Sequence, residues 1–324
     1  MKILNISFAD SAGAAYTLSH ALNKQGHTAI NMRANNNYLN YPTITALRHY
    51  DMETVRKMIL KTDVLVFHTA MKPFMQTFKL THADIKDKKK LLYFHGSDCR
   101  IYGDQIIDQA NHYWGDYEIL VSTPDLLEFV PAGSHWMPVC RSFKEIEEKY
   151  KPSKLDARAL EKFGEKYTNI LLGHAPTNPE LKGSNVFFRV ITNVVKQYEK
   201  AEYMPIHNLP WDSCLRTMAM LDLFYDQCVL GAYGAAAVEA SIFRIPVVCP
   251  LKKVVVDAMK AIADVPPPFI QFSTEPELEE KSLMLCMSED GRQMFGDMAY
   301  DYCKAVHDEK PVADRFMGIV NEMP

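Results

Sequence analysis

The stretch DLFYDQCVLGAYGAAAVEASIFRIP, residues 222–246, carries the pattern that decides the fold. It includes the end of an apolar strand predicted at 220–224 and the small-residue loop GAYG at 231–234. A helix is predicted at 234–243, and the apolar run PVVC at 246–249 is predicted to be the next strand. This order of strand, loop, helix and strand indicates two parallel strands joined by a crossover helix.

The same alternation extends over most of the chain. Further strands are predicted at 2–7, 29–32, 63–67, 91–94, 118–121, 169–172 and 203–206. A charged, strand-poor segment at 141–166 is predicted to connect two domains, and 324 residues suffice for two cores. The predicted fold class is therefore α/β, with two Rossmann-like domains facing a cleft. Ligands are expected at the carboxyl ends of the strands.

Composition argues against some classes of function. The formal net charge of -4 disfavours a protein that binds the nucleic acid backbone, and the basic run KDKKK at 86–90 is interpreted as a solvated loop. No apolar run approaches the roughly 20 residues that a membrane span needs, and the N-terminus lacks the pattern of a signal peptide. Seven cysteines without a C-x-x-C pair indicate reduced thiols, so a cytoplasmic location is expected.

Two loops at predicted strand ends contain residues suited to anion binding. The segment HAPTNPELKGSN, 174–185, places Lys182 just before a helix, where free N–H groups and an ammonium suit a diphosphate. In the loop at 231–234, small residues let the amide at Gly234 approach a ligand. Glu239 follows in an apolar helix, where its carboxylate needs hydrogen bonds that a ribose diol could donate. Ordinary helix caps and a Glu239 satisfied by the protein itself are the alternatives.

These two segments, in this order, resemble the donor-binding domain of retaining GT-B glycosyltransferases of the large family 4 group. The resemblance implies that Lys182 binds phosphate, that Gly234 is the glycine at the helix start and that Glu239 holds the ribose hydroxyls. His174 stands near the place of the family's arginine. Gly231 replaces the first glutamate of the family's pair, which implies a different sugar contact and more room.

The variant loop is expected to use other groups in place of that glutamate. Backbone amides around Tyr233 are candidates for contacting the sugar or the second phosphate. Asp226-Gln227 upstream is a candidate element of a variant motif, D-Q-x-x-x-G-x-Y-G.

The first half of the chain resembles the same group more loosely. In SAGAA, 11–15, Gly13 and Ala14 match the loop that faces the donor phosphates, and in HGSDCR, 95–100, His95 and Asp98 are candidates near the sugar or acceptor. The implied domains are 1–150 on the acceptor side and 151–305 binding the nucleotide sugar, with 306–324 as a helix that crosses back to the first domain.

The resemblance implies transfer of a sugar from a nucleoside diphosphate sugar to an acceptor hydroxyl, with retention. No cofactor is implied, and no metal either, because no D-x-D motif follows an apolar strand. The acceptor is open: a glycan, a lipid-linked saccharide, a protein or a modified nucleic acid. A nucleotide-sugar epimerase of the same fold and a degenerate, non-catalytic nucleotide-sugar-binding subunit are the alternative functions.

Overall fold

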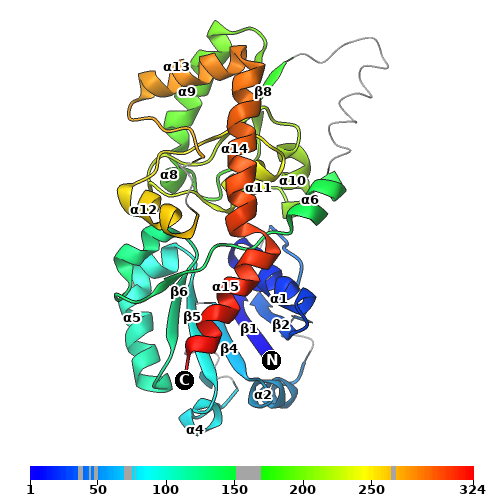
Figure 1. The fold of residues 1–324 in the computed structure, drawn as a ribbon, viewed down its shortest axis with the longest axis vertical. Coiled ribbons are helices and arrows are strands. Elements are labelled where there is room, and N and C mark those ends of the chain that lie inside the picture. The colour runs from blue at the N-terminus through cyan, green and yellow to red at the C-terminus, as the bar shows by residue number, and fades with distance from the viewer. Residues whose placement is uncertain are drawn as a thin grey trace. The chain divides into compact units, whose positions relative to one another are not determined.

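The computed structural model describes residues 1–35, 39–43, 45–46, 50–68, 75–76, 78–150, 169–263 and 268–324. The chain divides into two compact units, each built on its own sheet (Figure 1). Unit 1 comprises Met1–Arg141 and His307–Pro324, and unit 2 comprises Ser142–Val306. The fold is α/β with two parallel sheets, as the alternation of apolar and amphipathic segments predicted.

The sheet of unit 1 has the strand order β3-β2-β1-β4-β5-β6-β7 within the described residues, and its recorded pairings are parallel. The strands are β1 (Lys2–Ala9), β2 (Thr28–Asn35), β3 (Thr45–Ala46), β4 (Val64–His68), β5 (Lys89–Phe94), β6 (Glu118–Val121) and β7 (His135–Trp136). β4 is buried along its whole length, which explains the apolar run that precedes His68, its last residue.

Helices cover this sheet and complete its core. They are α1 (Ala14–Lys24), α2 (Met52–Leu60), α4 (His82–Ile85), α5 (Ser97–Trp114) and α15 (Glu309–Glu322), with 3-10 turns η1 (Ser11–Gly13) and η3 (Pro124–Phe129). Side chains of α15, including Val312, Phe316 and Val320, are buried in one core cluster with Leu18 and Leu22 of α1. The last helix of the chain therefore packs in the first unit (Figure 1).

The basic run at 86–90 is an exposed turn at Lys86 and Asp87, as predicted, but its last three residues are not solvated. Three of its lysines donate from Nζ to carbonyl groups where helices end: Lys88 to Leu60 at the end of α2 (2.8 Å), and Lys89 to Val320 near the end of α15 (2.8 Å). Lys90 is buried and donates to main-chain oxygens after α4 at 3.0–3.4 Å. An ammonium is stabilised at such a C-terminus because the terminal carbonyls lack partners within the helix.

Unit 2 has the sheet order β11-β10-β8-β9 within the described residues. Its strands are β8 (Ile170–His174), β9 (Ala201–Pro205), β10 (Leu223–Tyr225) and β11 (Val247–Val248). Its helices are α6 (Phe143–Tyr150), α8 (Pro179–Lys182), α9 (Ser184–Gln197), α10 (Trp211–Met218), α11 (Ala235–Ile242), α12 (Lys253–Ile262), α13 (Glu275–Met287) and α14 (Glu289–His307). A buried cluster from β8, β10, α9 and α13 forms its core.

The boundary between the units lies at Arg141 and Ser142 rather than at residue 150. The reason is local packing, because Tyr150 of α6 makes an edge contact with Phe243, just beyond α11, at 6.3 Å between ring centroids. Of the predicted connection at 141–166, residues 151–166 lie outside the described part of the chain.

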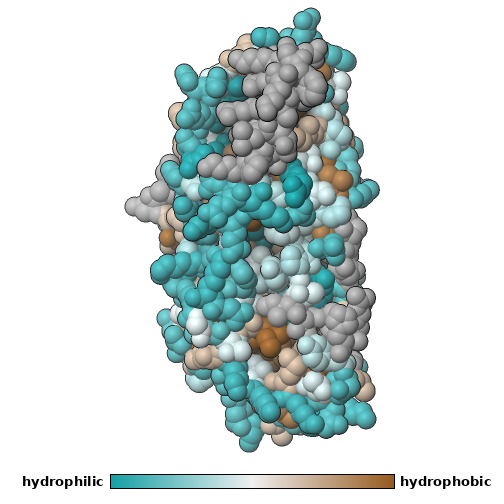
Figure 2. Space-filling model, turned by 90° about the vertical axis from the view of Figure 1, so that its right-hand side faces the viewer, coloured by the Kyte–Doolittle hydropathy of each residue, from teal (hydrophilic) through white to brown (hydrophobic). Residues whose placement is uncertain are grey.

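The surface shown in Figure 2 is predominantly hydrophilic, with hydrophobic residues in separate small areas. Among the described residues, no helix combines the length and the apolar character that crossing a bilayer requires.

Candidate functional site

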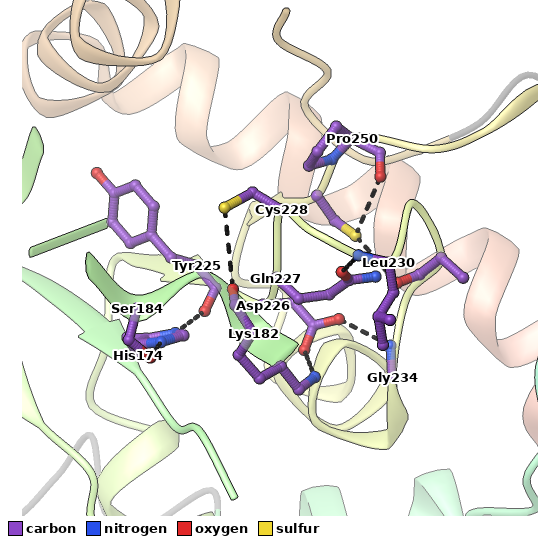
Figure 3. A network of polar contacts seen from close by, with 12 residues as sticks. His174, Lys182, Ser184, Tyr225, Asp226, Gln227, Cys228, Leu230, Gly234 and Pro250 are labelled. Carbon is purple, nitrogen blue, oxygen red and sulfur yellow. Dashed lines mark hydrogen bonds and ion pairs between the residues drawn. The ribbon is translucent and has the colours of Figure 1, made fainter. Parts of the chain in front are cut away.

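Three predicted elements of the donor site meet at the carboxyl end of β10 in unit 2 (Figure 3). Lys182 is the last residue of α8, and Gly234 is the N-cap of α11. Asp226, one residue after β10, lies between them: it accepts from Lys182 Nζ at 2.7 Å and from the Gly234 N–H at 2.7 Å. The Lys182 ammonium and the Gly234 N–H therefore point to the same place, which the carboxylate of Asp226 occupies.

The carboxylate of Asp226 is buried, with 1% of its side chain exposed, whereas the Lys182 side chain is 17% exposed. A buried carboxylate requires this kind of compensation, from an ammonium and from an amide at the positive end of a helix. The same donors would suit a phosphate oxygen. The sequence signal for Asp226 was its position directly after an apolar parallel strand, but the sequence alone could not reveal its two partners.

The neighbouring Gln227 orders the loop that follows. Its Oε1 accepts from the Leu230 N–H at 2.8 Å, and its side chain is buried. Its Nε2 is buried without a hydrogen-bond partner among the described residues. An amide donor in this state is costly to bury, so it is a candidate contact for a bound molecule.

His174 ends β8 and is fully engaged within the protein. Its Nδ1 lies 2.7 Å from the Tyr225 carbonyl oxygen, which can only accept, so Nδ1 carries the hydrogen. Its Nε2 lies 2.8 Å from Ser184 Oγ and accepts from that hydroxyl. Burial lowers the pKa of His174 to about 4, which keeps the ring neutral. The geometry gives His174 a positioning role at the start of α9, next to Lys182.

Glu239 lies in α11, just over one turn beyond Gly234, and is 3% exposed. Its Oε1 accepts from the indole N–H of Trp211, the first residue of α10, at 2.8 Å. Trp211 had no role in the sequence prediction, because nothing in the sequence reveals that α10 packs beside α11.

The loop before α11 differs from the expectation at Gly231, whereas Tyr233 keeps only the backbone contact that was expected of it. Gly231 has φ +69°, and a Cβ there would lie 2.4 Å from Lys252 Cγ, so Lys252 fills the space that the missing glutamate was expected to leave open. The ring of Tyr233 is 3% exposed and packs against Phe269 at 4.9 Å between centroids, with Tyr302 beside it. The Tyr233 side chain therefore belongs to the core, which leaves only its backbone as a candidate contact.

In unit 1, Gly13 and Ala14 lie at the start of α1, where Gly13 has φ +65° and its Cα faces Tyr41. Asp10 occupies this helix start, because its carboxylate accepts from the N–H groups of Ala15 (2.8 Å) and Tyr16 (3.0 Å). Burial raises the pKa of Asp10 to about 6. Each unit thus places a buried aspartate at the helix start that was predicted to bind phosphate.

The structure brings His95 and Asp98 together at the carboxyl end of β5. Both carboxylate oxygens of Asp98 accept from the His95 backbone N–H at 3.2 Å, which fixes the turn into α5. Burial raises the pKa of Asp98. The His95 ring contacts His68, the last residue of β4, with 2.8 Å between His95 Nε2 and His68 Nδ1. His68 is satisfied, but its partner is a candidate site residue.

Comparison with known proteins establishes the fold. No protein-family model and no curated protein sequence matches the chain. Among solved structures it is similar to Alr3699/HepE of Anabaena in complex with UDP and glucose (TM-score 0.61, 11% identity, 100% of each chain covered). It is also similar to a glycosyltransferase of Rickettsia africae (TM-score 0.63, 10% identity, 99% of this chain and 98% of the other).

A third similar structure is a candidate UDP-N-acetylglucosamine 2-epimerase of Listeria monocytogenes (TM-score 0.52, 11% identity, 98% and 95% covered). At these identities the likeness concerns the fold, which is that of GT-B glycosyltransferases.

Proposed function

We propose that this chain transfers a sugar from a nucleoside diphosphate sugar to an acceptor hydroxyl, with retention and without a required metal. One observation carries the proposal: Lys182 Nζ and the Gly234 N–H both lie 2.7 Å from a bound carboxylate at the start of α11. Such a pair of donors can stabilise the charge that develops on a leaving diphosphate. The solved structures of similar fold support it, since Alr3699/HepE holds UDP.

In this proposal Asp226 has two roles. While no ligand is bound, it compensates Lys182, and an arriving diphosphate competes with it for the ammonium. When a sugar nucleotide is bound, its carboxylate can accept from sugar hydroxyls, which compensates for the missing glutamate at Gly231. Glu239, whose carboxylate accepts from Trp211, would contact the nucleotide ribose. The seven cysteines are all free, which fits the proposed cytoplasmic location.

An epimerase acting on the same donor is the second candidate, supported by the similar Listeria structure. The two reactions differ in one observable, because an epimerase converts the nucleotide sugar without consuming an acceptor. Product analysis with and without acceptors separates them.

Nucleoside diphosphate is expected to bind equally well with and without divalent metal, because a lysine and a helix start supply the positive charge. Titration calorimetry with UDP, GDP and ADP identifies the best ligand, and its Kd is then measured in EDTA and in magnesium. The two values are expected to agree within about twofold. A loss of more than tenfold in EDTA would contradict metal-independent binding.

Asp226→Asn is expected to tighten binding of that nucleoside diphosphate by about tenfold, or roughly 1.4 kcal/mol. The substitution removes the competing negative charge, while the asparagine oxygen still accepts from the Gly234 N–H. Calorimetry measures the Kd. Asp212→Asn is the matched control, since Asp212 pairs with Lys149 on the surface of the same unit. Unchanged or weaker binding in Asp226→Asn would show that the carboxylate does not compete with the ligand.

A further inference from the structure

Four polar side chains of unit 1 form a hydrogen-bonded chain that runs from α1 across the strands β1, β4 and β5. Asn5 comes from β1, Ser19 from α1 and His68 from the last position of β4, and all three are at most 1% exposed. His95 follows β5 by one residue and is half-buried. Because β4 lies between β1 and β5 in the sheet, His68 can reach both neighbours.

Each contact in the chain has hydrogen-bond length. Asn5 Nδ2 donates to Ser19 Oγ at 2.9 Å, and Asn5 Oδ1 lies 3.0 Å from His68 Nε2. His68 Nδ1 lies 2.8 Å from His95 Nε2, and the two ring planes are within 6° of parallel with their centroids 5.0 Å apart, a separation that leaves room for an N–H···N bond between the ring edges.

The order of donors and acceptors assigns the protons. The amide oxygen of Asn5 can only accept, so His68 Nε2 carries a hydrogen. A neutral imidazole carries one hydrogen, so His68 Nδ1 is an acceptor and His95 Nε2 must donate to it. The remaining nitrogen, His95 Nδ1, then holds a lone pair.

Burial supports the neutral state of both rings, since it lowers the pKa of His68 well below the ordinary value and that of His95 to about 3. Among the described residues, His95 Nδ1 has no hydrogen-bond partner. It is also not a buried atom, so a ligand can reach it. A nitrogen of such low basicity is suited to accepting a hydrogen bond from a neutral group rather than to removing a proton.

We propose that Ser19, Asn5 and His68 are positioning residues that hold His95 in its Nε2–H form, so that His95 Nδ1 accepts a hydrogen bond from a ligand hydroxyl. The identity of this hydroxyl, on the sugar or on the acceptor, rests on the proposed function. The arrangement selects by hydrogen-bond polarity. A hydroxyl can donate to His95 Nδ1, whereas a carbonyl or fully ionised phosphate oxygen cannot.

The protonated nitrogen of each ring can be observed directly. Long-range ¹H–¹⁵N correlation spectra of ¹⁵N-histidine-labelled protein at pH 7, assigned with His68→Gln and His95→Gln, are expected to show both rings as neutral Nε2–H forms. A His95 ring that carries its hydrogen on Nδ1, or that is doubly protonated, would overturn the proposal. This readout needs no substrate, so it is independent of whether the proposed function holds.

Asn5→Leu removes the acceptor that sets the order and is expected to leave His68 and His95 as mixtures of both forms. Ser7→Ala is the matched control: Ser7 lies on the same strand, is fully buried, and its Oγ has no hydrogen-bond partner among the described residues. It is expected to keep the wild-type spectrum. If Asn5→Leu folds and retains a single Nε2–H form of His95, Asn5 is not a positioning residue. If it does not fold, the wild-type spectrum alone decides.

Turnover gives a second readout once a donor is known. Asn5→Leu is expected to lower kcat/KM roughly 10- to 100-fold while the Kd of the nucleoside diphosphate stays within about twofold. Unchanged kcat/KM in Asn5→Leu would contradict the role in hydroxyl recognition. Failure of the wild type to bind any nucleoside diphosphate would instead contradict the proposed function and leave the spectra as the test of the hydrogen-bond order.

Discussion

Replacing Lys182 with alanine is expected to destabilise unit 2 by about 3–5 kcal/mol, in addition to any effect on nucleotide binding. The loss arises because Asp226, 1% exposed, would lose the ammonium that compensates its buried carboxylate. Adding Asp226→Asn to the alanine variant is expected to restore most of the stability, since the unpaired charge disappears. Urea unfolding followed by hydrogen exchange in peptides of unit 2 measures both effects.

The matched control is Lys149→Ala in the same unit. Lys149 pairs with Asp212 on the surface, where the side chains are 56% and 46% exposed, and such exposed pairs contribute about 1 kcal/mol or less. Equal, small losses for Lys149→Ala and Lys182→Ala would show that water already compensates Asp226. In that case the Lys182–Asp226 pair would not mark an anion-binding site that excludes water.

Acidification below pH 6 is expected to destabilise both units, by about 1.4 kcal/mol per pH unit for each proton that the unfolded state binds in excess. Burial lowers the pKa of His68 well below 6.5, that of His95 to about 3 and that of His307 to about 4 in unit 1. In unit 2 it lowers the pKa of His174 to about 4.

The direction follows from proton binding. An unfolded histidine gains its proton near pH 6.5, whereas a folded ring with a lowered pKa stays neutral, so the unfolded state binds more protons as the pH falls. Asp10 opposes this effect below about pH 6, because its raised pKa makes the folded state bind a proton first. Asp98, whose pKa burial also raises, opposes it in the same way, so three histidines are opposed by two carboxyls, and the unfolded state of unit 1 keeps an excess of at least about one proton.

Urea unfolding at several pH values, with hydrogen exchange corrected for the intrinsic rate at each pH, separates the two units. His174→Gln removes the titrating group from unit 2 and is expected to flatten its pH dependence while that of unit 1 persists. Greater stability of either unit at pH 5 than at pH 7 would contradict the neutral, buried state of these histidines.

Local sequence patterns predicted the parallel α/β fold, because apolar strands and amphipathic helices can be recognised within short windows. Candidate residues at strand ends, such as Lys182 and His95, could be named for the same reason. Their partners could not. The contact between Lys182 and Asp226 depends on which strands are neighbours, and the link from Asn5 through His68 to His95 requires β4 to lie between β1 and β5.

Two errors have a common cause. The lysines at 88–90 bind helix ends, because tertiary packing decides the environment of a side chain that local composition assigns to solvent. Gly231 was interpreted as open space, but the neighbouring Lys252 occupies it.

The packing of α15 in unit 1 has a consequence for the order in which the chain can fold. Unit 2 is continuous in sequence, whereas unit 1 needs both the first 141 residues and the segment after residue 306. During synthesis the strands of unit 1 leave the ribosome first, but Phe316 and Val320 follow only after all of unit 2. The apolar face next to α1 therefore stays open to chaperones throughout that interval, and Lys89 reaches its carbonyl partners near the end of α15 only at the last step.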